Sequence, residues 1–191
     1  MDRMLTLFAA TDRDIARIAL RGADAARAES SLTVVGAMCI AADPNDPNRL
    51  LVGTFEQGAF LTEDGGETWR PVGAGIPHAR ILSVAISPCD RVNGKSVLYA
   101  GSEPSNLYRS DDDGATWRDF PALPALPSAP TWSFPPRPWT SHVRWIALHP
   151  TDPQTIYVGI ELGGVMTTRD GGATWEDRKP GAQPDAHALA T

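Results

Sequence analysis

The sequence predicts an all-β protein built from repeated four-stranded units. One short pattern, Ser/Thr-x-Asp-x-Gly-x-Thr-Trp, occurs three times, at Thr62–Trp69, Ser110–Trp117 and Thr168–Trp175. Two short apolar runs precede each copy. They are rich in Val, Ile, Leu and Tyr and bounded by Pro, Asp, Asn or Gly, which is typical of strands. The Trp residues lie 48 and 58 residues apart, close to the roughly 40–50 residues of a propeller blade once one long insertion is subtracted.

Each repeat is expected to hold strands A to D. Strand A carries the text CIAA, SVAI or WIAL, and strand B carries LLVG, LYAG or IYVG. Strand C leads into the Asp pattern, and strand D begins at its Trp. We predict a single propeller domain over 1–191, with complete units at about 37–75, 80–127 and 142–180. Residues 4–36 form a unit without strand A, in which LTLFAAT, IARIAL and SLTVVG serve as strands B, C and D.

The Asp pattern is expected to form the turn between strands C and D. An Asp carboxylate accepts nearby backbone N–H groups in a tight turn, and Gly adopts positive φ without a Cβ clash. The Trp then packs a large apolar area against a neighbouring strand. These roles predict that the repeated residues are structural rather than catalytic: Thr62, Asp64, Gly66, Trp69, Ser110, Asp112, Gly114, Trp117, Thr168, Asp170, Gly172 and Trp175.

The pattern resembles the Asp-box, or BNR repeat, of sialidase-like β-propellers. The wider text around the third copy, HP-x-DP-x-x-IYVG-x-x-x-GGV-x-x-T-x-DGG-x-TW, is similar to BNR-type propellers described as glycosyl hydrolase-like. It is also similar to sortilin-type and photosystem-assembly-factor propellers. The resemblance implies a β-propeller, and it implies rings of more than four blades. Activity does not follow from it, because the same fold carries many functions.

Two interpretations of the ring follow from the strand count. The text DAHALAT at 185–191 looks like a lone strand A. Either the chain is an open arc, an N-terminal part of a larger propeller, or residues 185–191 pair with LTLFAAT and close a four-bladed ring. We favour the open arc. An open arc leaves blade edges exposed, and self-association through those edges is therefore expected.

Composition narrows the choice of partners. The net charge is −6, the sequence pI is about 5.1, and no Lys/Arg cluster occurs, which argues against nucleic acid and anionic membranes as partners. The apolar run Met4–Ala10 lacks a cleavage signature, so a cytoplasmic location is predicted. No metal-ligand spacing or cofactor motif is visible, so neither a metal nor a cofactor is predicted. Cys39 and Cys89 are expected to be buried thiols rather than a disulfide.

The strand order sorts candidate residues by face. The D-to-A and B-to-C connections should share one end of the blades, here called the mouth face, and the Asp patterns should lie at the opposite end. The Pro/Trp-rich loop 120–142 is a D-to-A connection that holds seven of the seventeen prolines. Its Trp132, Arg137 and Trp139 are candidate contacts to a sugar or peptide. The alternative is that the loop packs its own Trp side chains onto a blade.

Charged residues are expected at the same mouth face. Arg80, His142, Arg144 and His187 could hold an anionic ligand, or could pair with nearby acids. The B-to-C loops supply Glu56, Glu103 and Glu161. Paired carboxylates are what glycoside hydrolysis requires. Glu103 and Glu161 are therefore candidate catalytic residues, although repetition at one blade position also suits a structural role.

Three functions remain open from the sequence. The leading hypothesis is a non-catalytic binding or scaffold propeller for a glycan or protein, which leans against an enzyme. The alternatives are a glycoside hydrolase-like, sialidase-like enzyme with Glu103 and Glu161 at the mouth, and an inactive truncated propeller. The sialidase version is weakened because all three Tyr residues fall in predicted strands. An enzyme requires the two carboxylates to be free of arginine partners, and a binding protein requires an exposed Trp132 or Trp139.

Overall fold

The computed structural model describes residues 4–21, 26–34, 36–185 and 188. It confirms the all-β prediction, since the described residues hold four β-sheets, one 3-10 helix (η1, Ala129–Thr131) and no α-helix. The first sheet comprises β1 (Met4–Ala10), β2 (Asp14–Arg21) and β3 (Arg27–Thr33). The second comprises β4 (Ala37–Asp43), β5 (Asp46–Thr54), β6 (Ala59–Thr62) and β7 (Arg70–Pro71). The third comprises β8 (Ile81–Val92), β9 (Lys95–Ser102), β10 (Leu107–Ser110) and β11 (Arg118–Asp119), and the fourth comprises β12 (Val143–Leu148), β13 (Ile156–Ile160) and β14 (Gly164–Thr168).

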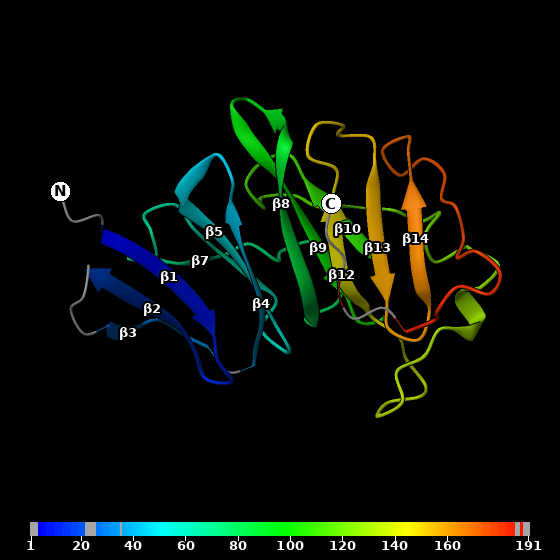
Figure 1. The fold of residues 1–191 in the computed structure, drawn as a ribbon, viewed down its shortest axis with the longest axis horizontal. Helices are drawn as coiled ribbons and strands as arrows, with labels where there is room; N and C mark the ends of the chain where they lie inside the picture. Colours follow the sequence, from blue (N-terminus) through cyan, green and yellow to red (C-terminus); the bar gives the residue numbers. More distant parts are fainter. Residues whose placement is uncertain (1–3, 22–25, 35, 186–187, 189–191) are drawn as a thin grey trace.

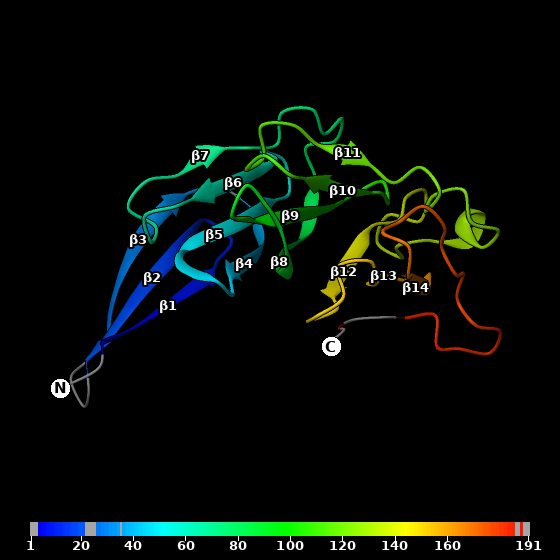
Figure 2. The same ribbon diagram turned by 90° about the horizontal axis from the view of Figure 1, so that it is seen from above.

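Every sheet is an antiparallel meander whose strands follow in chain order. The four sheets stand side by side in an open arc, and the inner strand β8 contacts the inner strands β4 and β12 on either side of it (Figures 1 and 2). This is a partial propeller and not a closed four-bladed ring. The predicted lone strand at 185–191 falls almost wholly outside the described residues.

Among the described residues, the first sheet has three strands and no inner strand equivalent to β4, β8 or β12. Strand β1 contacts β4 of the next sheet, just as β5 contacts β8 and β9 contacts β12. Its three strands therefore occupy the B, C and D positions of a blade. At the other end of the arc, strand D of the fourth sheet is reduced to a single bridge between Thr167 and Glu176.

Three apolar clusters fill the spaces between neighbouring sheets. Fully burying each Leu, Ile or Val in them contributes about 1.5–3 kcal/mol relative to leaving it exposed. The sheets approach so closely that the strand-B glycines Gly53 and Gly101 have no room for a side chain. A Cβ on Gly101 would lie 2.5 Å from Val143 Cγ1, and one on Gly53 would lie 2.7 Å from the Ile81 carbonyl oxygen.

The three Asp patterns form matching turns between the third and fourth strand positions of their sheets. In the first, Thr62 Oγ1 donates to Asp64 Oδ1 at 2.7 Å and accepts the Gly66 N–H at 3.0 Å. Thr68 donates its N–H and its hydroxyl to the Asp64 carboxylate. The other two turns repeat these bonds. Hydrogen bonds from Thr68 and then Thr62 lower the pKa of Asp64 to about 2. The carboxylate is thus committed to its own turn.

These turns lie at the end of the sheets opposite the mouth face. The Gly65 N–H donates to the carbonyl oxygen of Asn48 near the start of β5, and the Gly171 N–H donates to that of Gln154 in the connection between β12 and β13. Buried Arg49 joins two sheets there, because it contacts Asp43 at 2.9 Å and Asp113 at 2.5 Å. We call this end the turn face. No helix in the described part of the chain is long and apolar enough to cross a membrane.

Candidate functional site

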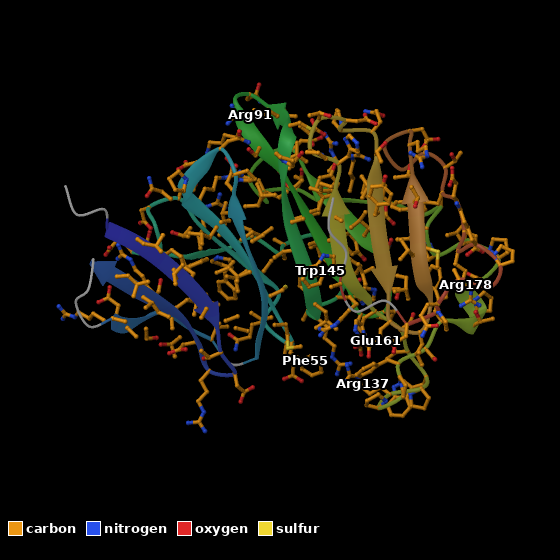
Figure 3. The ribbon with its side chains drawn as sticks, in the orientation of Figure 1. Phe55, Arg91, Arg137, Trp145, Glu161 and Arg178 are labelled. Atoms are coloured by element: carbon orange, nitrogen blue, oxygen red, sulfur yellow. The ribbon has the colours of Figure 1, made fainter. Side chains whose placement is uncertain are left out.

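The mouth face gathers charged and aromatic side chains from five separate connections and from the start of β12. Phe55, Glu103 and Glu161 each lie two residues after the glycine of strand B, at Gly53, Gly101 and Gly159. Figure 3 shows Phe55, Arg137 and Glu161 together at the lower edge of the arc, with Arg91 at the opposite edge. We call the whole group the mouth cluster: Phe55, Arg80, Glu103, Phe134, Arg137, His142, Arg144 and Glu161.

Glu103 lies at the centre of the mouth cluster. Its side chain is 1% exposed. Arg137 donates from Nε to Oε1 at 3.0 Å and from Nη2 to Oε2 at 2.6 Å, and Arg80 Nη1 donates to Oε1 at 2.9 Å. Burial raises the pKa of Glu103, but the hydrogen bonds and charges of Arg137 and Arg80 outweigh it and leave the pKa lowered. Glu103 is therefore an ionised anchor for two arginines.

The guanidinium groups of the same two arginines also lie over the faces of two aromatic rings, Phe55 and Phe134. The Arg80 and Arg137 guanidinium carbons lie 4.7 and 5.0 Å from the Phe55 ring centroid. Arg137 also lies 4.6 Å from the Phe134 centroid. Such cation–π contacts contribute about 0.5–1 kcal/mol each at partly exposed sites. They tie the Pro/Trp-rich loop to the second and third sheets.

His142 lies between the two glutamates. Its Nε2 is 3.1 Å from Glu161 Oε2, and its Nδ1 is 3.7 Å from Glu103 Oε2. Burial lowers the pKa of His142 more than the two carboxylates raise it. The ring is therefore neutral near pH 7. Because a carboxylate only accepts, the proton sits on Nε2 and is donated to Glu161.

Glu161 is the more accessible of the two glutamates, with 16% of its side chain exposed. Arg144 Nε lies 3.8 Å from Glu161 Oε2, beyond hydrogen-bonding distance. The mouth cluster holds three arginines, two glutamates and one histidine. Its guanidinium groups outnumber its carboxyl groups, which suits hydroxyl-rich or weakly anionic ligands.

The structure brings together six of the residues that the sequence singled out: Arg80, Glu103, Arg137, His142, Arg144 and Glu161. Trp132 does not join them. It is 8% exposed, it packs in the cluster between the third and fourth sheets, and its Nε1 donates to Ser128 Oγ. Its prediction as a ligand contact is wrong, because the loop folds this ring onto the fourth sheet. Trp139 is 79% exposed, and His187 lies outside the described residues.

Phe55 and Phe134 belong to the mouth cluster but were not predicted from the sequence. Both are uncharged residues in connections, and their sequence surroundings contain no recognisable motif. Counting from the strand-B glycine would have found Phe55, because it occupies the position of Glu103 and Glu161. Counting from the Asp pattern instead selected its neighbour Glu56, which is exposed.

A glutamate can act as an acid or base only if one of its carboxyl oxygens can reach the substrate. Glu103 cannot, because it is buried and the guanidinium groups of Arg80 and Arg137 contact both of its oxygens. Its prediction as half of an acid/base pair fails for this reason. The contacts of Glu161 with His142 and Arg144 both reach Oε2, and 16% of its side chain is exposed to solvent. Within the described ranges, no group of three or more His, Cys, Asp or Glu is placed to hold a metal ion.

Comparisons with known proteins place the chain among propellers. No protein-family model matches it. A xyloglucanase from a Paenibacillus species is 31% identical over 169 residues, covering 73% of this chain and 16% of its own length. Xyloglucanase Xgh74A of Acetivibrio thermocellus is 31% identical over 170 residues, covering 74% of this chain and 19% of its own length.

A solved structure shows the same fold. The GH74 xyloglucanase from Xanthomonas campestris aligns with a TM-score of 0.64 at 20% identity, covering 94% of this chain and 29% of that chain. At this identity the likeness establishes the β-propeller fold alone. The chain spans 16–19% of the length of the curated relatives that it matches.

These relatives overturn the leading functional hypothesis. A non-catalytic binding or scaffold propeller was expected, with a lean against an enzyme, whereas the curated relatives over three quarters of the chain are xyloglucanases. The findings favour the glycoside hydrolase alternative. The hypothesis was wrong because activity depends on loop residues, whereas the repeated motifs that dominate this sequence indicate only the fold.

Proposed function

We propose that the chain forms part of a propeller glycoside hydrolase that acts on xyloglucan or a closely related branched glucan. The observation that carries this proposal is the coincidence of two findings. Relatives 31% identical over about three quarters of the chain are xyloglucanases. A semi-exposed carboxylate, Glu161, stands among cationic and aromatic residues at the mouth face.

In this proposal Glu161 supplies one of the two carboxylates that glycoside hydrolysis needs. His142 donates to Oε2 of Glu161 at 3.1 Å and so fixes the orientation of the carboxylate. Arg144 adds a positive charge 3.8 Å from the same oxygen. An oriented carboxylate beside a positive charge suits a general base or a nucleophile. Because two arginines hold Glu103, the proposal requires the second carboxylate to come from a residue outside the mouth cluster.

Glu103 acts as a positioning residue. It fixes Arg137 in a bidentate ion pair, and Arg137 in turn lies over Phe134 and Phe55. The Pro/Trp-rich loop is thereby held along the mouth face, where it forms one wall of the glycan site. Trp139, exposed on that loop, is a candidate glycan contact in this proposal.

The finer classification also belongs to this proposal. The three turns share one hydrogen-bond pattern, in which the first hydroxyl and the last Thr both bind the Asp carboxylate. This pattern supports assigning them as Asp-box, or BNR-type, repeats. Their role is structural, because each carboxylate is saturated by its own turn.

Hydrolysis of xyloglucan tests the function. Purified protein is expected to release new reducing ends from xyloglucan. Glu161→Gln should lower kcat by about 10²–10⁴-fold while leaving oligosaccharide binding close to the wild-type value, because a general acid or base acts in the transition state.

Glu103→Gln is the matched comparison. It removes the same charge from the same repeat position and should raise KM more than it lowers kcat, because Glu103 acts through the arginines. The proposal fails if the protein neither binds nor cleaves xyloglucan. It also fails if Glu161→Gln cleaves at the wild-type rate.

A further inference from the structure

Strand β1 has an unpaired inner edge among the described residues. In the other three sheets the strand at this position, β5, β9 or β13, pairs with an inner strand, β4, β8 or β12. Strand β1 pairs with β2 alone. Its sequence, MLTLFAA, holds no charged residue and no proline, which are the residues that usually protect an exposed edge from association.

The outer face of the first sheet is apolar and exposed. Phe8 points to the inner face, because it packs in the cluster between the first and second sheets. Leu5 and Leu7 alternate with Phe8 along β1 and therefore lie on the outer face. They are 53% and 45% exposed, and their partners across the strand pair are Leu20 and Ile18. We call these four leucine and isoleucine residues the first-sheet face.

The fourth sheet, at the other end of the arc, presents positions that are covered in the third sheet. Tyr99 and Leu107 of the third sheet pack against the fourth sheet and are 1% and 0% exposed. Tyr157 and Val165 occupy the same register positions in the fourth sheet and are only half-buried. Together with Trp145, which is 41% exposed, they form what we call the fourth-sheet face.

Trp145 distinguishes the fourth-sheet face from the equivalent faces within the arc. Its register position, opposite the strand-B glycine, holds Cys39 in the second sheet and Ser83 in the third. Cys39 donates to the Ile81 carbonyl oxygen at 3.8 Å, at the start of the next inner strand. Ser83 donates in the same way to the Val143 carbonyl oxygen at 2.8 Å. An indole is too large for the space that a thiol or hydroxyl fills beneath an inner strand, so it suits a neighbour without one.

We propose that two copies of this chain associate head to tail, with the fourth-sheet face of each copy on the first-sheet face of the other. The described part of the first sheet has no inner strand, so the Trp145 indole can pack there against Leu5 and Leu7. The contact continues the packing by which each sheet of the arc receives the next. One chain cannot make this contact with itself, because its first and fourth sheets lie at opposite ends of the arc (Figures 1 and 2).

Two copies suffice to close a ring. A head-to-tail contact either closes into a ring or continues into a filament. The described residues of each copy hold four sheets, so two copies hold eight, which is within the roughly four to eight blades of propellers. Closure covers both apolar faces of both copies. The inference is independent of the proposed hydrolysis, since it concerns the two ends of the arc.

Sedimentation velocity of the 191-residue protein over a range of concentrations tests the proposal. The expected mass is about 41 kDa, twice the 20.5 kDa of one chain. Leu7→Glu and Trp145→Glu each place a carboxylate in both contacts of the ring, and each should weaken dimerisation at least about 100-fold because an unpaired charge is costly to bury. Both side chains are exposed in the single chain, so circular dichroism should show an unchanged fold. Leu5→Glu is a second variant of the same face and should behave like Leu7→Glu.

An equimolar mixture of Leu7→Glu and Trp145→Glu identifies the head-to-tail geometry. It combines the intact fourth-sheet face of the first variant with the intact first-sheet face of the second. The mixture should therefore form two-chain particles at concentrations where each variant alone is monomeric. Contact between like faces predicts a different result, because only one of the two substitutions would then dissociate the dimer.

Trp139→Glu is the matched control, because it makes the same exchange at a tryptophan that is 79% exposed on the loop 120–142, outside both faces. It should dimerise like the wild type. The proposal is overturned by a wild-type monomer at every concentration, by polymers larger than two chains, by a mixture that does not associate, or by equal effects of Trp139→Glu and Trp145→Glu. Xyloglucan cleavage by a monomer would remove the dimer alone, and an inactive dimer would remove the proposed function alone.

Discussion

The two ends of the arc both carry several carboxylates but use them in opposite ways. On the turn face, Asp64, Asp112 and Asp170 bind groups within four residues of themselves. On the mouth face, Glu103 and Glu161 bind side chains that are 15 or more residues away in the sequence. The local hydrogen bonds of the turn face stabilise the same turn three times. The long-range ion pairs of the mouth face join different connections, and a functional site can form there.

The largest expected effect is on the turn face. Gly172→Ala should lower the free energy of unfolding by about 3 kcal/mol. Residue 172 has φ +89°, which strains an L side chain, and the new Cβ would lie 2.1 Å from Phe120 Cδ1. Urea denaturation followed by circular dichroism measures the loss.

Gly94→Ala separates the two causes. Gly94 has φ +83°, and nothing lies within 4 Å of the new Cβ. It should lose only about 1 kcal/mol, which is the strain alone. Equal losses for the two variants would show that docking of the turn on the preceding sheet contributes nothing.

The next effect is on the mouth face. Glu103→Gln should cost about 2 kcal/mol, below the roughly 3–5 kcal/mol for breaking a fully buried pair, because Arg80 and Arg137 keep contact with solvent. Thermal denaturation at neutral pH measures it.

Asp112→Asn makes the same type of exchange on the turn face. It should cost less than Glu103→Gln, because the amide retains an acceptor oxygen for the Thr116 N–H and the site is exposed. A larger loss for Asp112→Asn would contradict the contrast drawn between the two faces.

The smallest effect is a pH dependence at the mouth face. Burial lowers the pKa of His142 below its ordinary 6.5, so the unfolded chain binds more protons than the folded one between the two values. Stability should therefore rise with pH until it reaches about 6.5, the ordinary pKa of histidine in the unfolded chain. His142→Gln should flatten this part of the profile, measured as the midpoint of denaturation between pH 5 and 8. An unchanged slope in the variant would contradict the assignment.

The repeat made the fold predictable from the sequence, and it also sorted the residues by face. Arg80, Glu103, Arg137, His142, Arg144 and Glu161 meet because the predicted strand order sends their connections to one end. The partners of each residue were not predictable. Arg137 forms the ion pair with Glu103 because of the path of the 23-residue loop 120–142. That loop has no regular periodicity, so its path could not be predicted.

Burial was the other unpredictable quantity. Trp132 and Trp139 lie in one loop with similar surroundings in the sequence, yet their exposed fractions are 8% and 79%. The difference comes from Ser128, which bonds the Trp132 indole and is itself fixed by Asp177 from beyond the fourth sheet. Activity could not be predicted from the Asp patterns either. The three turns have the same structure, so they say nothing about what the mouth face binds.

The docking of each turn on the sheet before it gives the arc a direction. The Gly66 turn rests on Phe8 and Ser31, the Gly114 turn on Val72, and the Gly172 turn on Phe120. In every case the surface that receives the turn is encoded earlier in the chain. During synthesis each receiving surface therefore leaves the ribosome before the turn that packs on it, and this order is compatible with assembly of the sheets from the N-terminal end.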